Sequence, residues 1–313
     1  MAYTAGDLIL DDHYNTFATG SVGGTATDSA NVNNVWGVGT GDRGYGQSTT
    51  LSAVTAGTTV TATQWATLLS RISTIASHQG TSITAITSPV AGNTIAAYTA
   101  LSTNIASIHT NRLNNAAFGT TSATNTSGSA AWDTYTIHTI TVTFADANSR
   151  RYFFNAGGEI RIDTTISGGT ADGKYNEWVD LSNTLAGQVI FGAHGTTKSG
   201  GTGTPTTLAG SIGNYELTDT AQDIYLQYAD SSPYTSNYIL VRAWSPAGQP
   251  NKIMFYVLYR DDSADQTYNK AVYTPLDVMD GTVTTTTTIA PPSTTYLTNT
   301  WGTPTVSGTN AQA

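Results

Sequence analysis

The sequence has no cysteine and few charged residues, and both absences restrict what the protein can be. Without cysteine the chain forms no disulfide and offers no thiolate to a zinc ion. Cysteine usage therefore does not indicate whether the protein works in an oxidising or a reducing compartment. Charged residues make up 11% of the chain, where a globular domain usually has about 25%. Lys and Arg number 12 against 21 Asp and Glu, a formal charge of −9, and no basic cluster surrounds Arg150 and Arg151. A nucleic-acid partner needs a clustered basic face, so we expect none.

Long apolar runs are missing as well. The longest strongly apolar stretch, Ile253 to Tyr259, is far shorter than the ~20 residues that span a bilayer. The first twelve residues, MAYTAGDLILDD, contain neither a cationic segment nor an apolar run of the length that a secretory signal has. We therefore expect no membrane span, and synthesis in a cytoplasm without a secretory signal.

Small polar residues fill the chain instead: Thr, Gly, Ser, Asn and Ala, with five consecutive threonines from Thr284 to Thr288. Threonine favours extended strands, and Gly and Asn favour turns. Seventeen Tyr and six Trp partly replace the scarce aliphatic side chains. This composition is typical of an extracellular or virion structural protein, and it predicts a folded chain with thin cores that are completed by copies of itself or by neighbours.

Residues 1–58 and 59–118 are expected to differ in structure. The first segment has no sustained period and reads as an irregular, extended N-terminal arm. In the second, apolar residues from Trp65 to Ala76 follow helical spacing, with Thr61 or Thr63 as N-cap and Gly80 as stop. After a break at Ser88-Pro89, a second helix with Asn93 as its cap completes a helical hairpin.

The second helix of this hairpin carries a narrow apolar seam. Its residues step by three and four positions, and the residues that we assign to self-association are Tyr98, Leu101, Ile105 and Ile108. Two interpretations stay open. The seam faces a second copy of the chain, or it packs on the first helix within one subunit.

Strand patterns follow the small-residue linker Gly119 to Ser129. Alternation or short apolar runs predict strands at 139–144, 152–154, 160–166, 224–228, 238–240 and 253–259, and a short helix is expected around Trp178. The fold class is therefore mainly β with a small α part: an antiparallel β-sandwich over 119–281, preceded by the helical hairpin and the irregular arm. Residues 282–313 are expected to form a Thr-rich extended C-terminal tail that extends toward other chains instead of packing on its own subunit. Both ends are expected to be ordered chiefly by other chains.

Several segments carry a family resemblance. They are Trp36-Gly37, Gly44-Tyr45-Gly46-Gln47, Thr63-Gln64-Trp65, His78-Gln79-Gly80-Thr81 and the run RYFFNAGGEIR from Arg151 to Arg161. In this order they resemble virion structural proteins of tailed bacteriophages, in particular tail and appendage proteins of marine and cyanobacterial contractile-tailed phages, over about residues 10–275. The resemblance implies a strand, a turn and a strand at 151–161, a place in the virion, and no catalytic residues.

Candidate chemical sites are weak when taken one by one. Gly39, Gly41 and Gly44 fit G-x-G-x-x-G, but neither a hydrophobic strand before them nor an amphipathic helix after them is visible, so a glycine-shaped loop is favoured over a nucleotide site. The five histidines are isolated in sequence and are interpreted as surface or hydrogen-bonding residues; they are His13, His78, His109, His138 and His194.

Acidic and aromatic residues leave two further alternatives. The acidic groups are Asp7, Asp11 and Asp12; Asp261, Asp262 and Asp265; and Asp277 and Asp280. The middle group could offer oxygen ligands to Ca²⁺ but lacks an EF-hand pattern, and a solvated acidic turn explains it as well. Trp36, Tyr45, Tyr234 and Trp244 could stack on sugars, although a core role is favoured. Glu159 and Arg161 point outward from one strand, with Arg151 on the strand before, so a modest cross-strand ion pair is expected.

The sequence thus predicts a non-enzymatic structural component of a bacteriophage virion, in the tail, baseplate or fibre, that contacts copies of itself and other virion proteins. One alternative is a receptor- or glycan-binding module at a fibre tip, with a host surface glycan as partner. Another is a neck or head-associated virion protein. A polysaccharide-degrading enzyme ranks last because no repeat period is visible. No catalytic, cofactor-binding or metal-ligating residue is assigned, and no cofactor is expected.

Overall fold

The computed structural model describes residues 11–22, 25–26, 29–88, 98–128, 130–171, 173–263 and 278–313. It contains two compact units, each assembled from separate pieces of the chain. The first unit comprises Met1–Thr120, Arg151–Gly158 and Pro291–Trp301. The second comprises Thr121–Arg150, Glu159–Ala290 and Gly302–Ala313.

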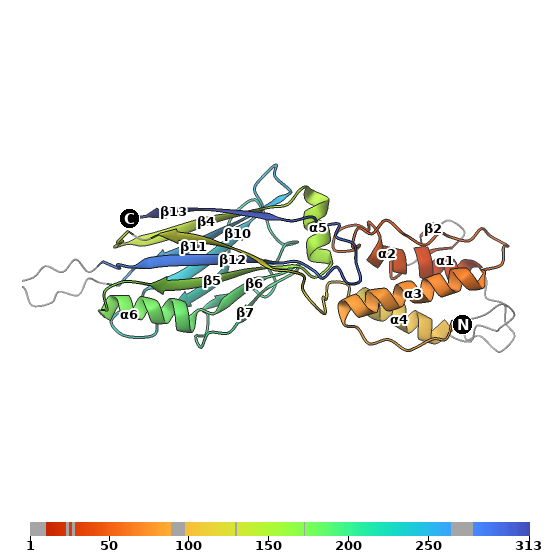
Figure 1. Ribbon diagram of the computed structural model, residues 1–313, viewed down its shortest axis with the longest axis horizontal. Helices are drawn as coiled ribbons and strands as arrows, with labels where there is room; N and C mark the ends of the chain where they lie inside the picture. The colour runs from red at the N-terminus through yellow and green to blue at the C-terminus, as the bar shows by residue number, and fades with distance from the viewer. Residues whose placement is uncertain are drawn as a thin grey trace, which may run out of the picture. The chain divides into compact units, whose positions relative to one another are not determined.

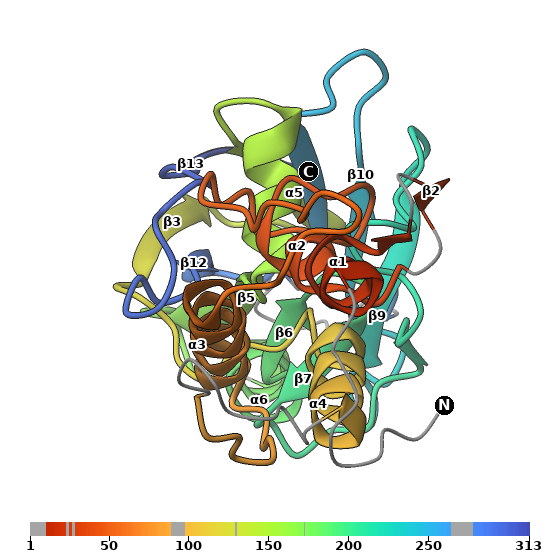
Figure 2. The ribbon, with the colours of Figure 1, turned by 90° about the vertical axis from the view of Figure 1, so that its right-hand side faces the viewer.

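The first unit is mainly helical. Its elements are α1 (Asp11–Thr19), β1 (Ser21–Val22), β2 (Thr25–Ala26), α2 (Val32–Trp36), α3 (Ala62–Gln79), α4 (Tyr98–Thr110) and the last turns of α5 (Ala147–Asn155). Figure 2 shows α3 and α4 nearly end-on and side by side, with α1 and α2 next to them.

Local chemistry sets both ends of α3, as the sequence predicts. The Thr61 side chain accepts a hydrogen bond from the Gln64 N–H, and the Gln64 side chain accepts one from the Thr61 N–H, a reciprocal capping box. Gly80 ends the helix in the left-handed conformation with φ of 67°. Between these caps one face is buried, with Trp65, Leu68, Ile72 and Ile75 at most 2% exposed.

The apolar seam of α4 is buried inside a single chain. Leu101 and Ile105 are 2% exposed and Ile108 is 0% exposed. The Tyr98 ring lies 5.2 Å from the Phe17 ring of α1, centroid to centroid. The structure therefore corresponds to the alternative in which the seam packs within one subunit. The proposed cap Asn93 lies outside the described residues.

The expected extended arm is packed rather than extended in its described part. Tyr14 and Phe17 of α1, and Val35 of α2, are at most 4% exposed, and the Tyr14 ring contacts the Trp65 ring at 5.8 Å. The Asn15 side chain holds the segment between α2 and α3, because it donates to the Val54 carbonyl and accepts from the Val54 N–H. Aromatic side chains supply the apolar area that aliphatic residues do not, which is why this segment folds on its own subunit.

The second unit is a sandwich of two antiparallel sheets, so the fold class predicted from the sequence is confirmed. One sheet has six strands in the order β13-β4-β11-β10-β9-β8 and the other has five in the order β3-β12-β5-β6-β7 (Figure 1). The six strands are β13 (Thr305–Gln312), β4 (Tyr135–Thr143), β11 (Lys252–Arg260), β10 (Tyr238–Trp244), β9 (Gln222–Tyr228) and β8 (Thr207–Leu208). The five are β3 (Ser122–Gly128), β12 (Thr282–Ala290), β5 (Glu159–Ser167), β6 (Gln188–Phe191) and β7 (Thr196–Ser199).

The Thr-rich segment that the sequence predicts to be the start of a tail is β12, the second strand of the five-stranded sheet. It pairs with β3 on one side and with β5 on the other. Its side chains alternate, with Thr285 and Thr287 both 0% exposed and their neighbours turned outward. The tail prediction is wrong here because polar Thr285 is satisfied inside the sandwich: its Oγ1 lies 2.8 Å from His138 Nδ1 and 2.7 Å from the Tyr259 hydroxyl.

The linker prediction for 119–129 and the tail prediction for 305–312 also need correction. Residues 122–128 form β3, and residues 305–312 form β13, so each ends one sheet. β3 lies against β13, and a Cβ built on Gly308 would come within 1.9 Å of Thr126 Oγ1. Small residues in these strands therefore allow the two sheets to approach closely at this edge.

Residues 147–155 form the helix α5, not the expected strand. The Asp146 carboxylate accepts a 2.7 Å hydrogen bond from the Ser149 N–H at the helix start, which lowers the pKa of Asp146. Gly157 then adopts a φ of 84° and leads into β5. Three consecutive aromatic residues resemble a strand core, but the cap at Asp146 favours a helix.

The short helix expected near Trp178 is present as α6 (Gly173–Asp180), continued by the π-helix η1 (Leu181–Leu185). The Trp178 ring contacts the Trp132 ring at 4.9 Å and the Tyr259 ring at 6.5 Å. Lys174 and Asp261 form an ion pair of 2.5 Å in which each side chain is 1% exposed. An apolar cluster and one buried charge pair thus hold α6 on the sandwich.

Candidate binding groove on helix α3

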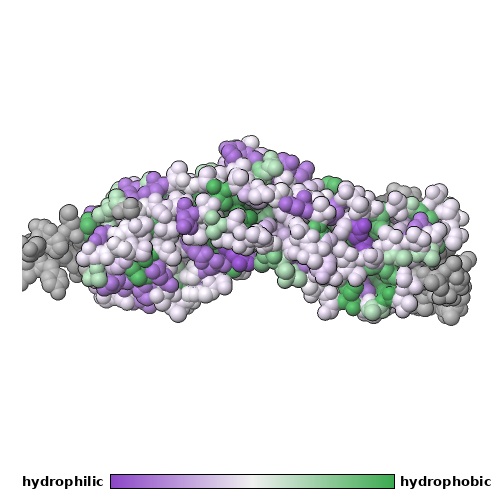
Figure 3. Space-filling view, in the orientation of Figure 1, coloured by the Kyte–Doolittle hydropathy of each residue, from purple (hydrophilic) through white to green (hydrophobic). Residues whose placement is uncertain are grey.

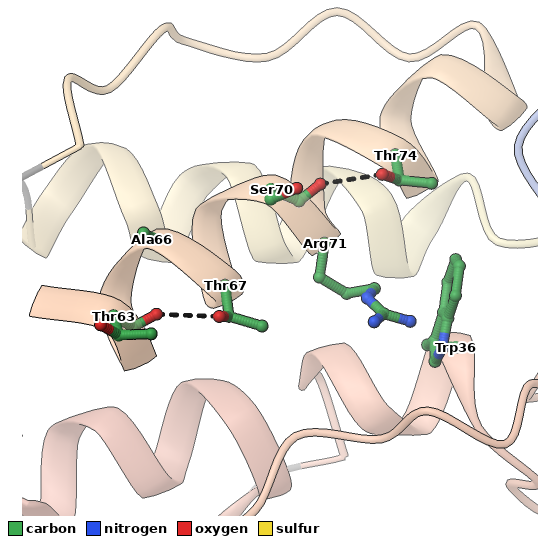
Figure 4. Close-up of a pocket in the computed structure, with 7 residues that line it drawn as sticks. All are labelled: Trp36, Thr63, Ala66, Thr67, Ser70, Arg71 and Thr74. Atoms are coloured by element: carbon green, nitrogen blue, oxygen red, sulfur yellow. Dashed lines mark hydrogen bonds between the residues drawn. The ribbon is translucent and has the colours of Figure 1, made fainter. Parts of the chain in front are cut away.

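A groove of about 420 Å³ lies along α3 in the first unit. Its lining residues, drawn in Figure 4, are Trp36, Thr63, Ala66, Thr67, Ser70, Arg71 and Thr74. Five of them are small: Thr63, Thr67, Ser70 and Thr74 recur every three or four positions with Ala66 beside Thr67, so they line one face of the helix. The groove exists because that face carries no large side chain apart from Arg71.

Arg71 is the charged residue of the groove. Its guanidinium carbon lies 3.8 Å from the centroid of the Trp36 ring, and its Nη1 donates a 3.1 Å hydrogen bond to Thr49 Oγ1. In Figure 4 the side chain extends from α3 toward the Trp36 ring. Stacking on an aromatic face fixes the guanidinium plane and leaves its edge for other acceptors.

No carboxylate among the described residues pairs with Arg71. Partial burial lowers its pKa because the charged form loses hydration. By contrast, Arg112 pairs with Asp42, Arg242 with Asp223 and Arg260 with Asp262. A half-buried cation without a counter-ion is a favourable place for an anionic group of a ligand.

The hydroxyl groups of the groove offer acceptor capacity. Thr67 Oγ1 donates to the Thr63 carbonyl and Thr74 Oγ1 donates to the Ser70 carbonyl, as the dashed lines in Figure 4 show. Each hydroxyl thereby uses its one proton for a hydrogen bond to the helix backbone, and its oxygen lone pairs stay available as acceptors. The groove can therefore accept hydrogen bonds from hydroxyl groups beside a cation that binds an acid.

The aromatic residues considered for sugar stacking lie mostly in the interior. Tyr45 is 0% exposed, and its hydroxyl accepts from the Gln79 amide and donates to the Arg112 carbonyl. Tyr234 is 8% exposed. Trp36 is 7% exposed and reaches the groove only at its margin. The core interpretation favoured by the sequence therefore holds for these residues, while Trp244 of β10 is half-buried.

The glycine pattern at 39–44 forms a turn-rich loop. Gly39, Gly41 and Gly44 all have positive φ, of 54°, 58° and 89°. Side chains of α5 hold the loop, because Asn155 Nδ2 donates to the Gly44 carbonyl and Arg151 Nη1 donates to the Arg43 carbonyl. Arg151 therefore holds this loop, and in β5 Glu159 and Arg161 pair with each other at 2.8 Å.

The predicted acidic group at 261–265 is not a single solvated turn. Asp261 is buried with Lys174, Asp262 pairs with Arg260 at the surface, and Asp265 lies outside the described residues, as do Asp7 and Asp277. A different set, missed in the sequence, brings carboxylate oxygens together. Glu177, Asp180 and Asp230 each place one such atom within 4.8 Å of the others, a spacing that could hold a hard cation. Asp230 is 50 positions from Asp180 along the chain, so no local spacing reveals the set.

The histidines fit the expected hydrogen-bonding role at three positions. His78 Nε2 lies 2.9 Å from the Ala156 carbonyl oxygen, His138 Nδ1 contacts Thr285, and His194 Nδ1 lies 2.6 Å from Glu216 Oε1. Burial lowers the pKa of His78, and it lowers the pKa of His138 to about 4. Both buried rings are therefore neutral at pH 7.

The surface gives no strong indication of a partner by hydropathy alone. On the face shown in Figure 3, apolar and hydrophilic residues occur in small groups among near-neutral ones. Among the described residues, the large apolar side chains that are exposed are Val38, Leu208 and Tyr296. In the same part of the chain, no helix is both long and apolar enough to cross a membrane.

Comparison with known proteins adds no identity. No family model matches the chain, and no curated protein or solved structure is significantly similar to it.

Proposed function

We propose that the protein is a non-enzymatic structural component of a bacteriophage virion, in the tail, baseplate or fibre, and that it assembles through contacts between subunits. The resemblance of residues 10–275 to virion structural proteins and the Thr-rich composition with few charged residues support this proposal. The observation that carries it is the open, uncharged edge of the sandwich.

Two strands form this edge, β3 with the sequence SATNTSG and β13 with the sequence TVSGTNAQ. Each ends its sheet, and neither contains a charged residue or proline. Monomeric β-proteins usually protect such edges with charges, prolines or bulges. At the other side of the sandwich the sheets are joined, since the Thr196 N–H of β7 donates to the Ala209 carbonyl just after β8 at 3.0 Å. An edge left open on one side suits a subunit whose neighbours complete it.

The test is to locate the chain in intact particles. An antibody raised against the purified protein is used for immunogold labelling of banded, nuclease-treated virions, and the same particles are analysed by mass spectrometry. We expect labelling of the tail, baseplate or fibre and a fixed copy number per particle. Labelling at the neck or head would favour the alternative location, and absence from the particles contradicts a virion role.

The α3 groove favours a second candidate, binding of a host glycan. Arg71, which has no carboxylate partner in the described part of the chain, fits a carboxylated sugar whose hydroxyl groups donate to Thr67 and Thr74. We expect the protein to bind uronic- or sialic-acid oligosaccharides on an array more tightly than neutral ones. Arg71→Gln should abolish this preference and Arg242→Gln, at a surface ion pair, should not. Equal binding by both variants contradicts a role for the groove.

A further inference from the structure

The hydrogen-bonding pattern of β13 shows which of its residues face the open edge. The Ala313 N–H donates to the Tyr135 carbonyl at 3.0 Å, and the Tyr135 N–H donates to the Ala313 carbonyl at 3.1 Å. This doubly bonded pair lies in the same register as Thr305 with Thr143 and Gln312 with Thr136, without a shift. In antiparallel strands, doubly bonded pairs alternate with pairs that exchange no hydrogen bond.

Residues 305, 307, 309 and 311 therefore bond to β4. The backbone groups of the intervening residues point away from β4, and these residues are Val306, Gly308, Asn310 and Gln312. Among the described residues, no strand pairs with this outer side of β13. The edge thus presents a regular array of N–H and C=O groups along an extended strand.

We propose that the β13 strands of two copies of the chain pair antiparallel across a twofold axis at Thr309. This inference rests on the proposed assembly role and names its partner. In this register Val306 lies opposite the partner's Gln312, and Gly308 lies opposite the partner's Asn310. All four outward residues then form doubly bonded pairs, about eight hydrogen bonds in total.

Pro304 disfavours one of the neighbouring registers. When the axis is moved to Gly308, Gln312 lies opposite the partner's Pro304, and proline has no N–H to donate. A second copy fits because the strand is self-complementary in this register and a closed twofold interface uses the same patch on both subunits.

The side chains agree with self-pairing. On the exposed face Thr309 lies opposite the partner's Thr309, a favourable cross-strand pair, and Ser307 lies opposite the partner's Ala311. On the inner face Thr126 of the same chain fills the space beside Gly308, and the Asn310 side chain accepts from Thr136 Oγ1 and donates to Gln312 Oε1 within its own subunit. No charged residue opposes another.

The first experiment uses position Thr309, which is exposed, so we expect a substitution there to leave the subunit fold intact. Sedimentation velocity of the full chain is measured over a range of concentrations, with a thermal transition recorded for each variant. We expect a wild-type dimer and an unchanged dimer for Thr309→Val. Thr309→Lys should weaken dimerisation about tenfold or more, because two like charges face each other across the axis. An equimolar mixture of Thr309→Lys and Thr309→Glu should restore it as a heterodimer.

The second experiment follows residue-resolved amide exchange in the wild type and in Thr309→Lys. The amides of 306, 308, 310 and 312 should exchange slowly in the dimer and rapidly in the variant, while those of 305, 307, 309 and 311 stay protected in both. A wild-type monomer at every concentration, a dimer indifferent to Thr309→Lys, or protection without this alternation overturns the proposal. Particle labelling is independent of these results, so a virion protein without β13 pairing is recognised as such.

Discussion

At the scale of single residues, three polar groups inside the sandwich form hydrogen bonds to one another across the two sheets. Thr285, His138 and Tyr259 come from three strands and two sheets, and all are 0% exposed. Their mutual hydrogen bonds replace the water that Thr285 Oγ1, His138 Nδ1 and the Tyr259 hydroxyl lose on folding. The Thr285 hydroxyl therefore links the two sheets as well as filling space between them.

Replacing this hydroxyl by a methyl group removes the hydrogen-bond partner of two buried groups. Thr285→Val should lower the free energy of unfolding by at least about 2 kcal/mol, because His138 Nδ1 and the Tyr259 hydroxyl both lose a partner. Thr288→Val, on the outward face of the same strand, should change it by less than about 0.5 kcal/mol. Urea unfolding of both variants measures the difference, and similar losses would contradict a role for the buried network.

His138 also predicts a dependence of stability on pH. Its pKa is about 4 in the folded protein and about 6.5 when unfolded, so the unfolded chain binds more protons between these values. The contribution of His138 is fully present above pH 6.5 and is lost as the pH falls to 4, about 3 kcal/mol in total. Unfolding measured at pH 7 and pH 4.5 should show a smaller loss in His138→Gln than in the wild type. Equal losses would mean that His138 does not titrate in this range.

At the scale of elements, the buried ion pair between Lys174 of α6 and Asp261 after β11 fixes a helix on the sandwich. Lys174→Met should cost about 3–5 kcal/mol, because it leaves a carboxylate buried without its counter-ion. Lys174→Met combined with Asp261→Leu should recover most of this loss. Arg260→Met, at the adjacent exposed pair with Asp262, should cost less than about 1 kcal/mol. Calorimetric unfolding tests the series, and a double variant no better than Lys174→Met refutes the charge argument.

The sequence predicts those elements whose periodicity and end signals agree. Helix α3 has a capping residue, an apolar face and a terminal glycine in register, and the strands β4 and β11 alternate cleanly. Helix α5 and strand β12 are missed for opposite reasons. In α5 three aromatic residues imitate a strand, whereas in β12 the inward positions carry threonine, so no apolar alternation is visible.

The candidate groove is less visible than the fold. The run of small residues at 63, 66, 67, 70 and 74 could be noticed as one polar helix face. The contact between Arg71 and Trp36 depends on how two helices pack, and the pair Lys174 and Asp261 joins positions 87 residues apart. Such long-range pairs leave no local pattern.

At the scale of the whole molecule, the last residues are structural parts of both units. A chain that ends at Gly281 lacks β12 and β13, so β3 and β5 lose their common partner and β4 loses one of its two neighbours. We expect this chain to show no cooperative thermal transition in the near-ultraviolet circular dichroism of its aromatic residues. A truncated chain with the wild-type transition would restore the interpretation of residues 282–313 as a dispensable tail.

The path of the chain between the two units has a consequence for the timing of folding. The chain passes from one unit to the other after residues 120, 150, 158, 290 and 301. During synthesis at about 5–20 residues per second, β3 and β5 emerge long before β12, the strand that must lie between them. Pairings so distant along the chain also close slowly. Both sheets therefore stay unfinished until β12 and β13 have been synthesised, and insertion of these two strands completes the sandwich.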